Sequence, residues 1–479
     1  MKYEAVIGLE IHLELKTKSK LFCGCSAAFG DKPNSNCCPV CLGLPGSLPV
    51  FNRRAIELAV TAALSLNSSV QLKSRFDRKN YFYPDLPKAY QVSQFDQPLG
   101  TGGYLEFNLD GAVKKVCLER VHLEEEAGKL VHAGNSILES EYSLVDYNRA
   151  GIPLLEIVTA PQIYSGREAR LFLEELRSVL LYSGASDCRM EEGSLRCDAN
   201  ISLRPRGAEA LGTKAEVKNM NSFRAVELAL NYEAGRQAAI LESGGQVIQQ
   251  TCHWDEEEKI TIPLRGKEGS SDYRYFPEPD LMPLVLDQTF VDSLKDLLPE
   301  LPEAKRRRLK ERYSLSSEEV ILLTSARELA DFFEEAASIY HDYSNLVKWV
   351  QGDLLFQLRE AGKPVAEIKP ALLVELLNLL DDGKINRPVA KDLLAGLVKQ
   401  GLSPARLVKE KGLGRISGEE SLAPMIGRVI EENPDAVNNF RQGKEKALVF
   451  LVGQIMAQTQ GRADPGEVNR LLRQKLARD

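Results

Sequence analysis

Polar and apolar residues alternate strictly along Val6–Leu15, close to the amino terminus. Every odd-numbered residue in this range is apolar, whereas the even-numbered positions after Gly8 carry Glu10, His12 and Glu14. A repeat of two residues is typical of a β-strand whose side chains point alternately to opposite faces. We therefore expect one face in a core, while the other presents two carboxylates and an imidazole, unless that face is simply solvated.

Three later segments repeat this combination of an apolar and a polar strand face. They lie at Val116–Lys129, Cys197–Arg204 and Glu216–Asn221. One polar strand face is usually a surface, but four in one sheet predict a polar trough in which a bound cation neutralises the acidic groups.

The first of these later segments contains three consecutive glutamates, Glu124–Glu126. One of them beside Glu10 and His12 would complete an oxygen-rich site of the kind that Mg²⁺ prefers. Alternation leaves open which glutamate this is, and a triple glutamate is also compatible with a solvated turn.

A polar turn at Asp146–Gly151 leads into a buried strand and contains Arg149. The strand itself carries Glu156 within an apolar run. An unpaired carboxylate is costly there, so we expect Glu156 to be paired, to bind a ligand or to lie at an edge.

The segment Phe76–Gln94 is a loop rich in aromatic residues, with Lys79 and Lys88 among them. Stacking faces and fixed cations suit a base, a ribose or a phosphate. An aromatic satellite core under a long loop explains the composition equally well.

Five cysteines follow the first strand closely. Cys23 and Cys25 form a C-x-C pair, and Cys38 and Cys41 form a C-x-x-C pair. Four thiolates at this spacing suit tetrahedral zinc, which we prefer to a set of small buried thiols. Cys37 is left over, because Cys38 is the partner that completes C-x-x-C.

The pattern changes to a helical repeat at about residue 296. We expect a mixed domain at 1–295, an all-α domain at 296–402 and a smaller all-α domain at 403–479. The helix at 301–312 is basic, which is usually a solvated face. Helical periods follow at 330–337, 346–360, 370–380 and 388–399.

In the last domain, Asn433 is expected to cap a helix that has Pro434 at its first position. The segment Asn438–Lys444 is expected to be an exposed loop that could hold a phosphate backbone.

Composition narrows the class of protein only modestly. The chain has 479 residues, nine cysteines and a formal charge of −7, so nucleic-acid binding would depend on local basic patches. We expect no signal peptide and no membrane span, because Glu4 and Glu10 interrupt the amino-terminal apolar stretch and no apolar run is long enough. Reduced thiols in a cytoplasm are the expected state.

The chain resembles the GatB family, the B subunits of tRNA-dependent aspartyl/glutamyl-tRNA amidotransferases, over essentially its whole length. Its tail resembles YqeY proteins. The strings that carry the resemblance are Val6–Leu15, Phe76–Asp85, His122–Lys129, Arg196–Ser202, Lys218–Ser222 and Tyr273–Asp280.

The resemblance implies an α+β protein: a mainly antiparallel-sheet cradle catalytic domain, an all-α helical domain and a small all-α YqeY-like tail domain. It implies a cytoplasmic ligase of protein biosynthesis that forms carbon–nitrogen bonds with glutamine as amido-nitrogen donor. ATP would phosphorylate the side-chain carboxylate of Glu on tRNA(Gln) or of Asp on tRNA(Asn). Ammonia released from glutamine by the A subunit would then displace the phosphate, in a heterotrimer of this chain with the A and C subunits. The sequence contains no G-x-x-x-x-G-K-[ST] motif, so the nucleotide is held in some other way.

The resemblance also implies roles for single residues. The magnesium site falls on Glu10, His12, Glu125, Asp198 and Glu216. The catalytic residues would be Glu10, His12, Glu125, Lys79 and Arg149, and substrate or phosphate contacts would come from Lys79, Lys88, Arg149 and Asn200. Zinc on Cys23, Cys25, Cys38 and Cys41 would be structural, and the tail would grip tRNA through Arg441, Lys444 and Lys446.

Two other classes of function fit the sequence less well. A non-catalytic tRNA-binding scaffold with a structural zinc does not explain several acidic groups and an imidazole gathered in one trough. A zinc-dependent hydrolase conflicts with the four cysteines, which close the zinc shell and leave no position for water.

Overall fold

The computed structural model describes residues 2–133, 141–264, 272–416, 418–459 and 461–478. The chain divides into two compact units, Met1–Ala304 and Lys305–Asp479. Each unit is described by itself.

The first unit is built around strand β1, Tyr3–Glu14. The predicted alternation is confirmed, since Ile7, Leu9, Ile11 and Leu13 are at most 1% exposed while the residues between them are half-buried. β1 pairs antiparallel with β11 (Pro153–Thr159) on one side and β12 (Leu195–Pro205) on the other. The earliest strand of the chain is therefore central in the sheet.

The main sheet runs in the order β15-β14-β13-β12-β1-β11-β8-β5-β4-β16, and only the β13–β14 pair is parallel among the pairings described. The long strand β8 carries Glu124 and Glu125 at its end and also pairs with β6 and β7. The remaining strands of this sheet are β2 (Ser69–Val70), β4 (Asp77–Asn80), β5 (Tyr90–Ser93), β6 (Gly100–Thr101), β7 (Tyr104–Leu109), β8 (Ala112–Glu125), β13 (Ala215–Lys218), β14 (Gln250–Asp255), β15 (Ile260–Pro263) and β16 (Phe276–Pro277). Two small sheets pair β9 (Lys129–His132) with β10 (Ser143–Asp146), and β3 (Lys73–Ser74) with β17 (Leu284–Val285).

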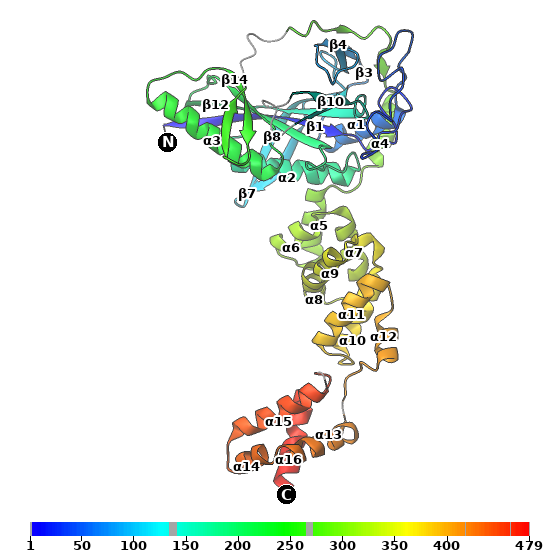
Figure 1. Ribbon diagram of the computed structural model, residues 1–479, viewed down its shortest axis with the longest axis vertical. Coiled ribbons are helices and arrows are strands. Elements are labelled where there is room, and N and C mark those ends of the chain that lie inside the picture. Colours follow the sequence, from blue (N-terminus) through cyan, green and yellow to red (C-terminus); the bar gives the residue numbers. More distant parts are fainter. Residues whose placement is uncertain (1, 134–140, 265–271, 417, 460, 479) are drawn as a thin grey trace. The chain divides into compact units, whose positions relative to one another are not determined.

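Helices cover the apolar face of this sheet. In Figure 1, α2 (Gly166–Ser183) and α3 (Phe223–Glu242) lie side by side beneath it, and they share one hydrophobic core with β1 and α1 (Arg53–Ser65). Asn52, Ser165 and Ser222 cap these three helices by accepting backbone N–H bonds. Because the helices occupy the apolar face, the charged side chains of β1 lie on the opposite face of the sheet.

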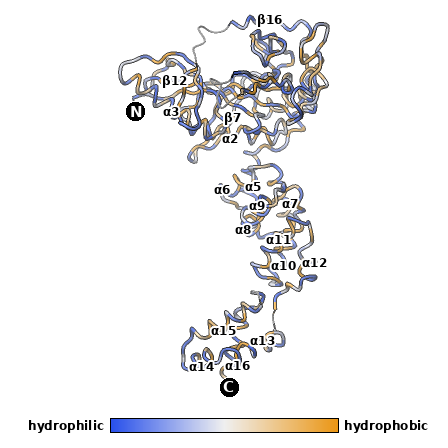
Figure 2. Tube along the Cα trace, in the orientation of Figure 1, coloured by the Kyte–Doolittle hydropathy of each residue, from blue (hydrophilic) through white to orange (hydrophobic). Residues whose placement is uncertain are grey.

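The described part of the second unit is helical. Its helices enclose two hydrophobic clusters, one drawn from 309–407 and one from 422–476, and Figure 2 shows polar and apolar positions interleaved along them. Ahead of it, α4 spans Gln288–Asp296. The helices that follow are α5 (Pro302–Tyr313), α6 (Ser317–Leu323), α7 (Arg327–Ala337), α8 (Tyr343–Lys348), the π-helix η1 (Trp349–Leu354), α9 (Leu355–Ala361), the 3-10 helix η2 (Val365–Glu367), α10 (Pro370–Asp381), α11 (Arg387–Gln400), α12 (Pro404–Lys411), α13 (Glu419–Glu432), α14 (Pro434–Arg441), α15 (Glu445–Gln458) and α16 (Pro465–Arg478). The predicted fold class, a mainly antiparallel sheet domain followed by helices, is confirmed.

Two local predictions in the tail were wrong. Asn433 precedes α14 but gives it no side-chain cap; its amide instead donates to the carbonyl of Val429 in the helix before. Helix α14 continues to Arg441, so the predicted loop at Asn438–Lys444 shrinks to its last three residues. No helix in the part of the chain that the structure describes is long and apolar enough to cross a membrane.

We expect Ile11→Ala to destabilise the first unit by about 2–5 kcal/mol, because the substitution leaves a cavity in the fully buried face of the central strand. Thermal and denaturant unfolding of the full chain would measure this. The matched control is Ile248→Ala, since Ile248 is 75% exposed and its truncation should change stability little. Equal effects of the two variants would contradict the central position of β1.

Candidate functional site

Three adjacent strands bring an imidazole, a carboxylate and a second imidazole into one row. His12 on β1 lies opposite Glu156 on β11, and Glu156 lies opposite His122 on β8. Directly opposed residues point to the same face of a sheet. Glu10 and Glu124, two residues along their own strands, therefore join the row on the polar face.

The side-chain atoms of this group lie close together. His12 Nε2 is 3.4 Å from Glu156 Oε2, 3.7 Å from Glu10 Oε1 and 3.8 Å from Glu124 Oε1. His122 Nε2 is 3.4 Å from the same Glu156 oxygen and 3.7 Å from Glu124 Oε2. Glu124, Glu156 and His122 are buried, whereas His12 and Glu10 are half-buried.

Opposite charges stabilise one another in this group. Burial disfavours a charged His12, but its contact with Glu156 and the charges of Glu124 and Glu156 outweigh burial and raise the pKa of His12 to about 9. Burial likewise works against ionisation of Glu156, yet the two histidines lower its pKa. The pKa of Glu10 is raised by burial and by the charge of Glu156. Each charged group in the row is therefore stabilised by the opposite charges beside it.

Asp198 and Glu216 extend the same polar face on β12 and β13. Asp198 lies opposite Glu10, but Lys218 already neutralises both acids, with Nζ 2.6 Å from Asp198 Oδ2 and 3.0 Å from Glu216 Oε1. Asn200 lies between Gly8 and Glu216 in the register. These predicted site residues border the histidine row, and Lys218 joins them as a residue that sequence reasoning missed.

Glu125 lies apart from this group. It follows Glu124 on the strand, so alternation turns its side chain to the opposite face, where its Oε1 pairs with Lys88 and accepts from the Val92 N–H at 2.8 Å. The structure thus places Glu124, and not the expected Glu125, beside His12.

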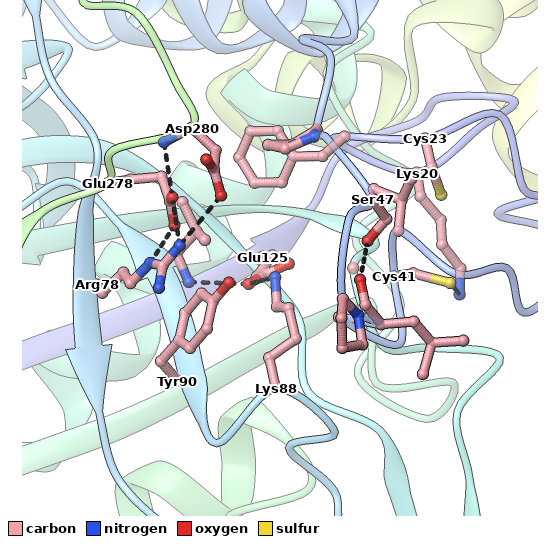
Figure 3. A pocket seen from close by; sticks show the side chains of 18 of the residues that line it. Lys20, Cys23, Cys41, Ser47, Arg78, Lys88, Tyr90, Glu125, Glu278 and Asp280 are labelled. Atoms are coloured by element: carbon pink, nitrogen blue, oxygen red, sulfur yellow. Dashed lines mark hydrogen bonds and ion pairs between the residues drawn. The ribbon is translucent and has the colours of Figure 1, made fainter.

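The Lys88–Glu125 pair lines a cavity of about 270 Å³ (Figure 3). A second ion pair, Arg78 with Glu278, lies across it, and Cys41 forms part of its other wall. The cavity thus lies between the segment that carries the clustered cysteines and the aromatic-rich segment 76–94. Lys88 belongs to it and not to the histidine row.

Lys79 and Arg149 have different surroundings. Lys79 lies over the ring of Tyr273 at 5.0 Å. Burial opposes its charge, but Glu124, Tyr275 and Glu156 raise the pKa of Lys79, so this ammonium faces the row. Arg149 donates to the carbonyls of Ala127 and Gly128 and thereby holds the turn after β8.

Lys79 lies on β4, so the segment 76–94, which was expected to be a loop, contains the strands β4 and β5. The aromatic residues between these strands are only partly packed. Tyr81 contacts Tyr273 edge-on, whereas Phe82 and Tyr83 are 79% and 59% exposed. Exposed rings beside a polar sheet face fit a loop that meets a ligand better than a closed satellite core.

His122 was not singled out from the sequence as a member of the site, and Glu124 was only one of three candidate glutamates, although a signal was present. His122-x-Glu124 repeats, in reverse order, the two-residue spacing of Glu10-x-His12. In a strand this spacing places an imidazole and a carboxylate on the same face.

The four expected cysteines form one cluster. Four sulfur atoms lie within 4.8 Å of one another, those of Cys23, Cys25, Cys38 and Cys41. Cys37 is outside the group. Contact with Cys23 lowers the pKa of Cys41 to about 4, and Lys20 Nζ lies 3.6 Å from its sulfur. Four convergent sulfurs, one of them favoured as a thiolate, form a donor set that can bind a metal ion.

A sheet domain with a histidine–carboxylate row and a cysteine cluster that can bind a metal ion, followed by helices, fits an enzyme. Family models agree, since residues 5–292 match the GatB/GatE catalytic domain and residues 331–476 match the GatB domain. The chain belongs to the GatB family.

Three relatives, each described as the B subunit of an aspartyl/glutamyl-tRNA(Asn/Gln) amidotransferase, are similar along their whole length. The relative from Carboxydothermus hydrogenoformans is 53% identical over 100% of this chain and 99% of its own. The relative from Moorella thermoacetica is 52% identical over 99% of this chain and 100% of its own. The relative from Caldanaerobacter subterraneus is 50% identical over 100% of both chains.

We expect the wild-type chain to retain zinc after purification and Cys38→Ser to lose most of it, because a hydroxyl would replace one of four thiolates in a closed shell. Cys37→Ser is the matched control and should keep its zinc. Metal analysis by mass spectrometry would measure both, and zinc loss from the Cys37 variant alone would overturn this ligand set.

Proposed function

We propose that this chain is the B subunit of a tRNA-dependent aspartyl/glutamyl amidotransferase. It would use ATP to phosphorylate the side-chain carboxylate of Glu on tRNA(Gln), of Asp on tRNA(Asn), or of both. The observation that carries the proposal is the row of His12, Glu156 and His122 on the polar face of a domain that matches the catalytic model. The full-length similarity to named B subunits supports it.

The chemistry explains why such a site is needed. A carboxylate is a poor electrophile, but transfer of the γ-phosphoryl group to one of its oxygens, with ADP leaving, gives an acyl phosphate. The nitrogen of ammonia then attacks the acyl carbon, the carbon–oxygen bond to phosphate breaks, and the amide remains on the tRNA. Both steps gather negative charge, so fixed cations and metal ions lower the barrier.

The residues of the row fit a divalent cation such as Mg²⁺. Glu10, His12, Glu124 and Glu156 would hold it, and it would neutralise phosphate charge when bound. Lys79, whose ammonium faces Glu124 and Glu156, is placed to contact a phosphate.

The other predicted site residues take supporting roles in this proposal. Asp198 and Glu216 would act at the border of the row once Lys218 moves or binds substrate, and Asn200 would donate to substrate beside them. Arg149 would position the turn after β8, and the Lys88–Glu125 pair would bind a polar group in its cavity.

The cysteine cluster would hold structural zinc, because four cysteines fill a tetrahedral shell. It would tie the loop after β1 into a compact unit beside the cavity. The A subunit would supply ammonia, and the A and C subunits would complete a cytoplasmic heterotrimer. The designation of the relatives as B subunits supports this assembly.

We propose three domains, at 1–295, 296–402 and 403–479. Three separate hydrophobic clusters support their number, but Leu407 of α12 belongs to the second cluster, so this helix packs with the second domain. The tail would bind tRNA through Arg441, Lys444 and Lys446, all of which are exposed.

We expect His12→Ala to lower ATP-dependent phosphorylation of Glu-tRNA(Gln) by at least about 100-fold while tRNA binding is retained, because the row loses a group that holds charge at the reacting phosphate. The assay uses the chain co-expressed with its A and C partners, labelled ATP, Mg²⁺ and Glu-tRNA(Gln), and follows ADP and Gln-tRNA(Gln). The control is His132→Ala on β9, outside the row. Normal turnover by the His12 variant would favour the non-catalytic scaffold.

We expect Arg441→Ala with Lys446→Ala to weaken tRNA binding and to lower the slope of log affinity against log salt by about 2, one for each lost phosphate contact. Filter binding at several salt concentrations would measure this. The matched control removes Lys409 and Lys411, exposed lysines in the last turn of α12. Equal salt slopes in both variants would contradict a specific role for the tail.

A further inference from the structure

We propose that Lys20 is a positioning residue that joins the cysteine cluster to the turn at 146–151, which leads into the strand of Glu156. Its side-chain nitrogen bridges the sulfur of Cys41 and the backbone carbonyl of Tyr147. The inference deepens the proposed function, because a metal ion on the cysteines would then influence the reaction through this lysine. It rests on the proposed function only for that influence.

Lys20 is buried without a carboxylate partner. Its side chain is 0% exposed, and no Asp or Glu among the described residues forms an ion pair with it. An isolated ammonium is costly in a protein interior, and lysines are almost never fully buried unless they are paired. A different negative group must therefore compensate its charge.

The cysteine cluster supplies that group. Lys20 Nζ lies 3.6 Å from Cys41 Sγ (Figure 3), and Cys41 is one of the four clustered cysteines. Cysteines that bind a metal ion do so as thiolates. The contact thus pairs a buried ammonium with a sulfur that carries negative charge when the cluster holds its metal.

The charge of the cluster explains why a cation is needed there. Four thiolates around one Zn²⁺ leave a net charge of about −2. Cys41 Sγ accepts the N–H of Cys38 at 3.1 Å as well as the ammonium of Lys20. Such outer contacts orient a metal ligand and tune its bond to the metal. Lys20 is therefore placed to slow the exchange of the metal ion.

The second contact of Lys20 holds the turn. Its Nζ donates to the carbonyl of Tyr147 at 3.1 Å, and the N–H of the next residue, Leu21, donates to the carbonyl of Gly151 at 2.8 Å. A methyl group at Gly151 would meet Cys41 Cβ at 3.5 Å and Lys20 Cδ at 3.6 Å. The turn therefore packs directly against the lysine and the cysteine.

The turn is bonded in its own right to the end of the strand that carries Glu124. The Gly151 N–H donates to the carbonyl of Glu126 at 2.8 Å, and the Glu126 N–H donates to the carbonyl of Ile152 at 2.9 Å. Glu126 comes two residues after Glu124, which faces His12. A shift of the turn would therefore move the end of β8 and, with it, a carboxylate of the histidine row.

Other contacts also dock the cysteine segment on the turn, but they do not involve the sulfurs. The Asn34 N–H donates to Asp146 Oδ1 at 2.9 Å, and the Asn36 N–H donates to Asn148 Oδ1 at 2.8 Å. Lys20 differs from these residues because one nitrogen contacts both a cysteine of the cluster and the turn. It is thus the contact through which metal binding would be felt at the turn.

The first test compares Lys20→Met with Lys18→Met in the full-length chain within its proposed complex. Lys18 is exposed, lies two residues away and is the matched control. With Co²⁺ in place of zinc, the thiolate-to-cobalt charge-transfer band of Lys20→Met should move to longer wavelength, because a sulfur that loses an N–H donor gives up electrons more readily. Zinc transfer to a chelator should be about 10-fold faster. Lys18→Met should match the wild type in both.

Hydrogen exchange tests the link to the turn. With zinc kept saturating, backbone amides at 147–151 should exchange faster in Lys20→Met than in the wild type or in Lys18→Met. In the assay with labelled ATP and Glu-tRNA(Gln), kcat of Lys20→Met should fall about 10-fold. KM for ATP should change little, because Lys20 acts through the turn and does not contact the nucleotide.

An unshifted cobalt band, or unchanged exchange at the turn, would overturn the proposal. If circular dichroism shows Lys20→Met to be unfolded, Lys20→Gln replaces it; its amide is a neutral donor, so a smaller band shift and faster zinc transfer are expected. The two proposals fail separately. A wild type without phosphorylation, beside a shifted band and faster exchange in Lys20→Met, removes only the proposed reaction. Normal phosphorylation beside an unshifted band removes only the role of Lys20.

Discussion

The polar face of the main sheet depends on how the free-energy cost of burying carboxylates is offset. Glu124 and Glu156 lie on a sheet face where water is largely excluded, and each would shift toward its neutral form without a cationic neighbour. His12, His122 and Lys79 provide that compensation from three different strands. The arrangement is useful for catalysis because the same cationic side chains that stabilise the buried carboxylates can stabilise the negative charge of a phosphate.

Much of this site could be predicted from residue spacing. The alternation along β1 predicted its polar and apolar faces correctly, and C-x-C with C-x-x-C identified the four clustered cysteines among nine. Glu156 was expected to be compensated because it interrupts an apolar run, and three ion contacts surround it.

The remainder depends on register, which spacing within one segment does not contain. The choice between Glu124 and Glu125 follows from which of them shares a face with His12, and this depends on how β8 is aligned through β11 with β1. The pairing of Lys218 with Asp198 and Glu216 likewise depends on the alignment of β12 with β13. The predicted cap at Asn433 was wrong because its side-chain amide donates to the carbonyl of Val429 in the preceding helix.

The central position of β1 has a consequence for how the protein is made. Its partners β11 and β12 are synthesised long after it, so the amino-terminal strand must wait, unpaired and with one strongly apolar face, while much of the domain emerges. Long-range pairing of this kind folds slowly and leaves hydrophobic surface exposed meanwhile. The nascent chain is therefore most prone to aggregation, and most in need of a chaperone, until the ribosome has passed Pro205.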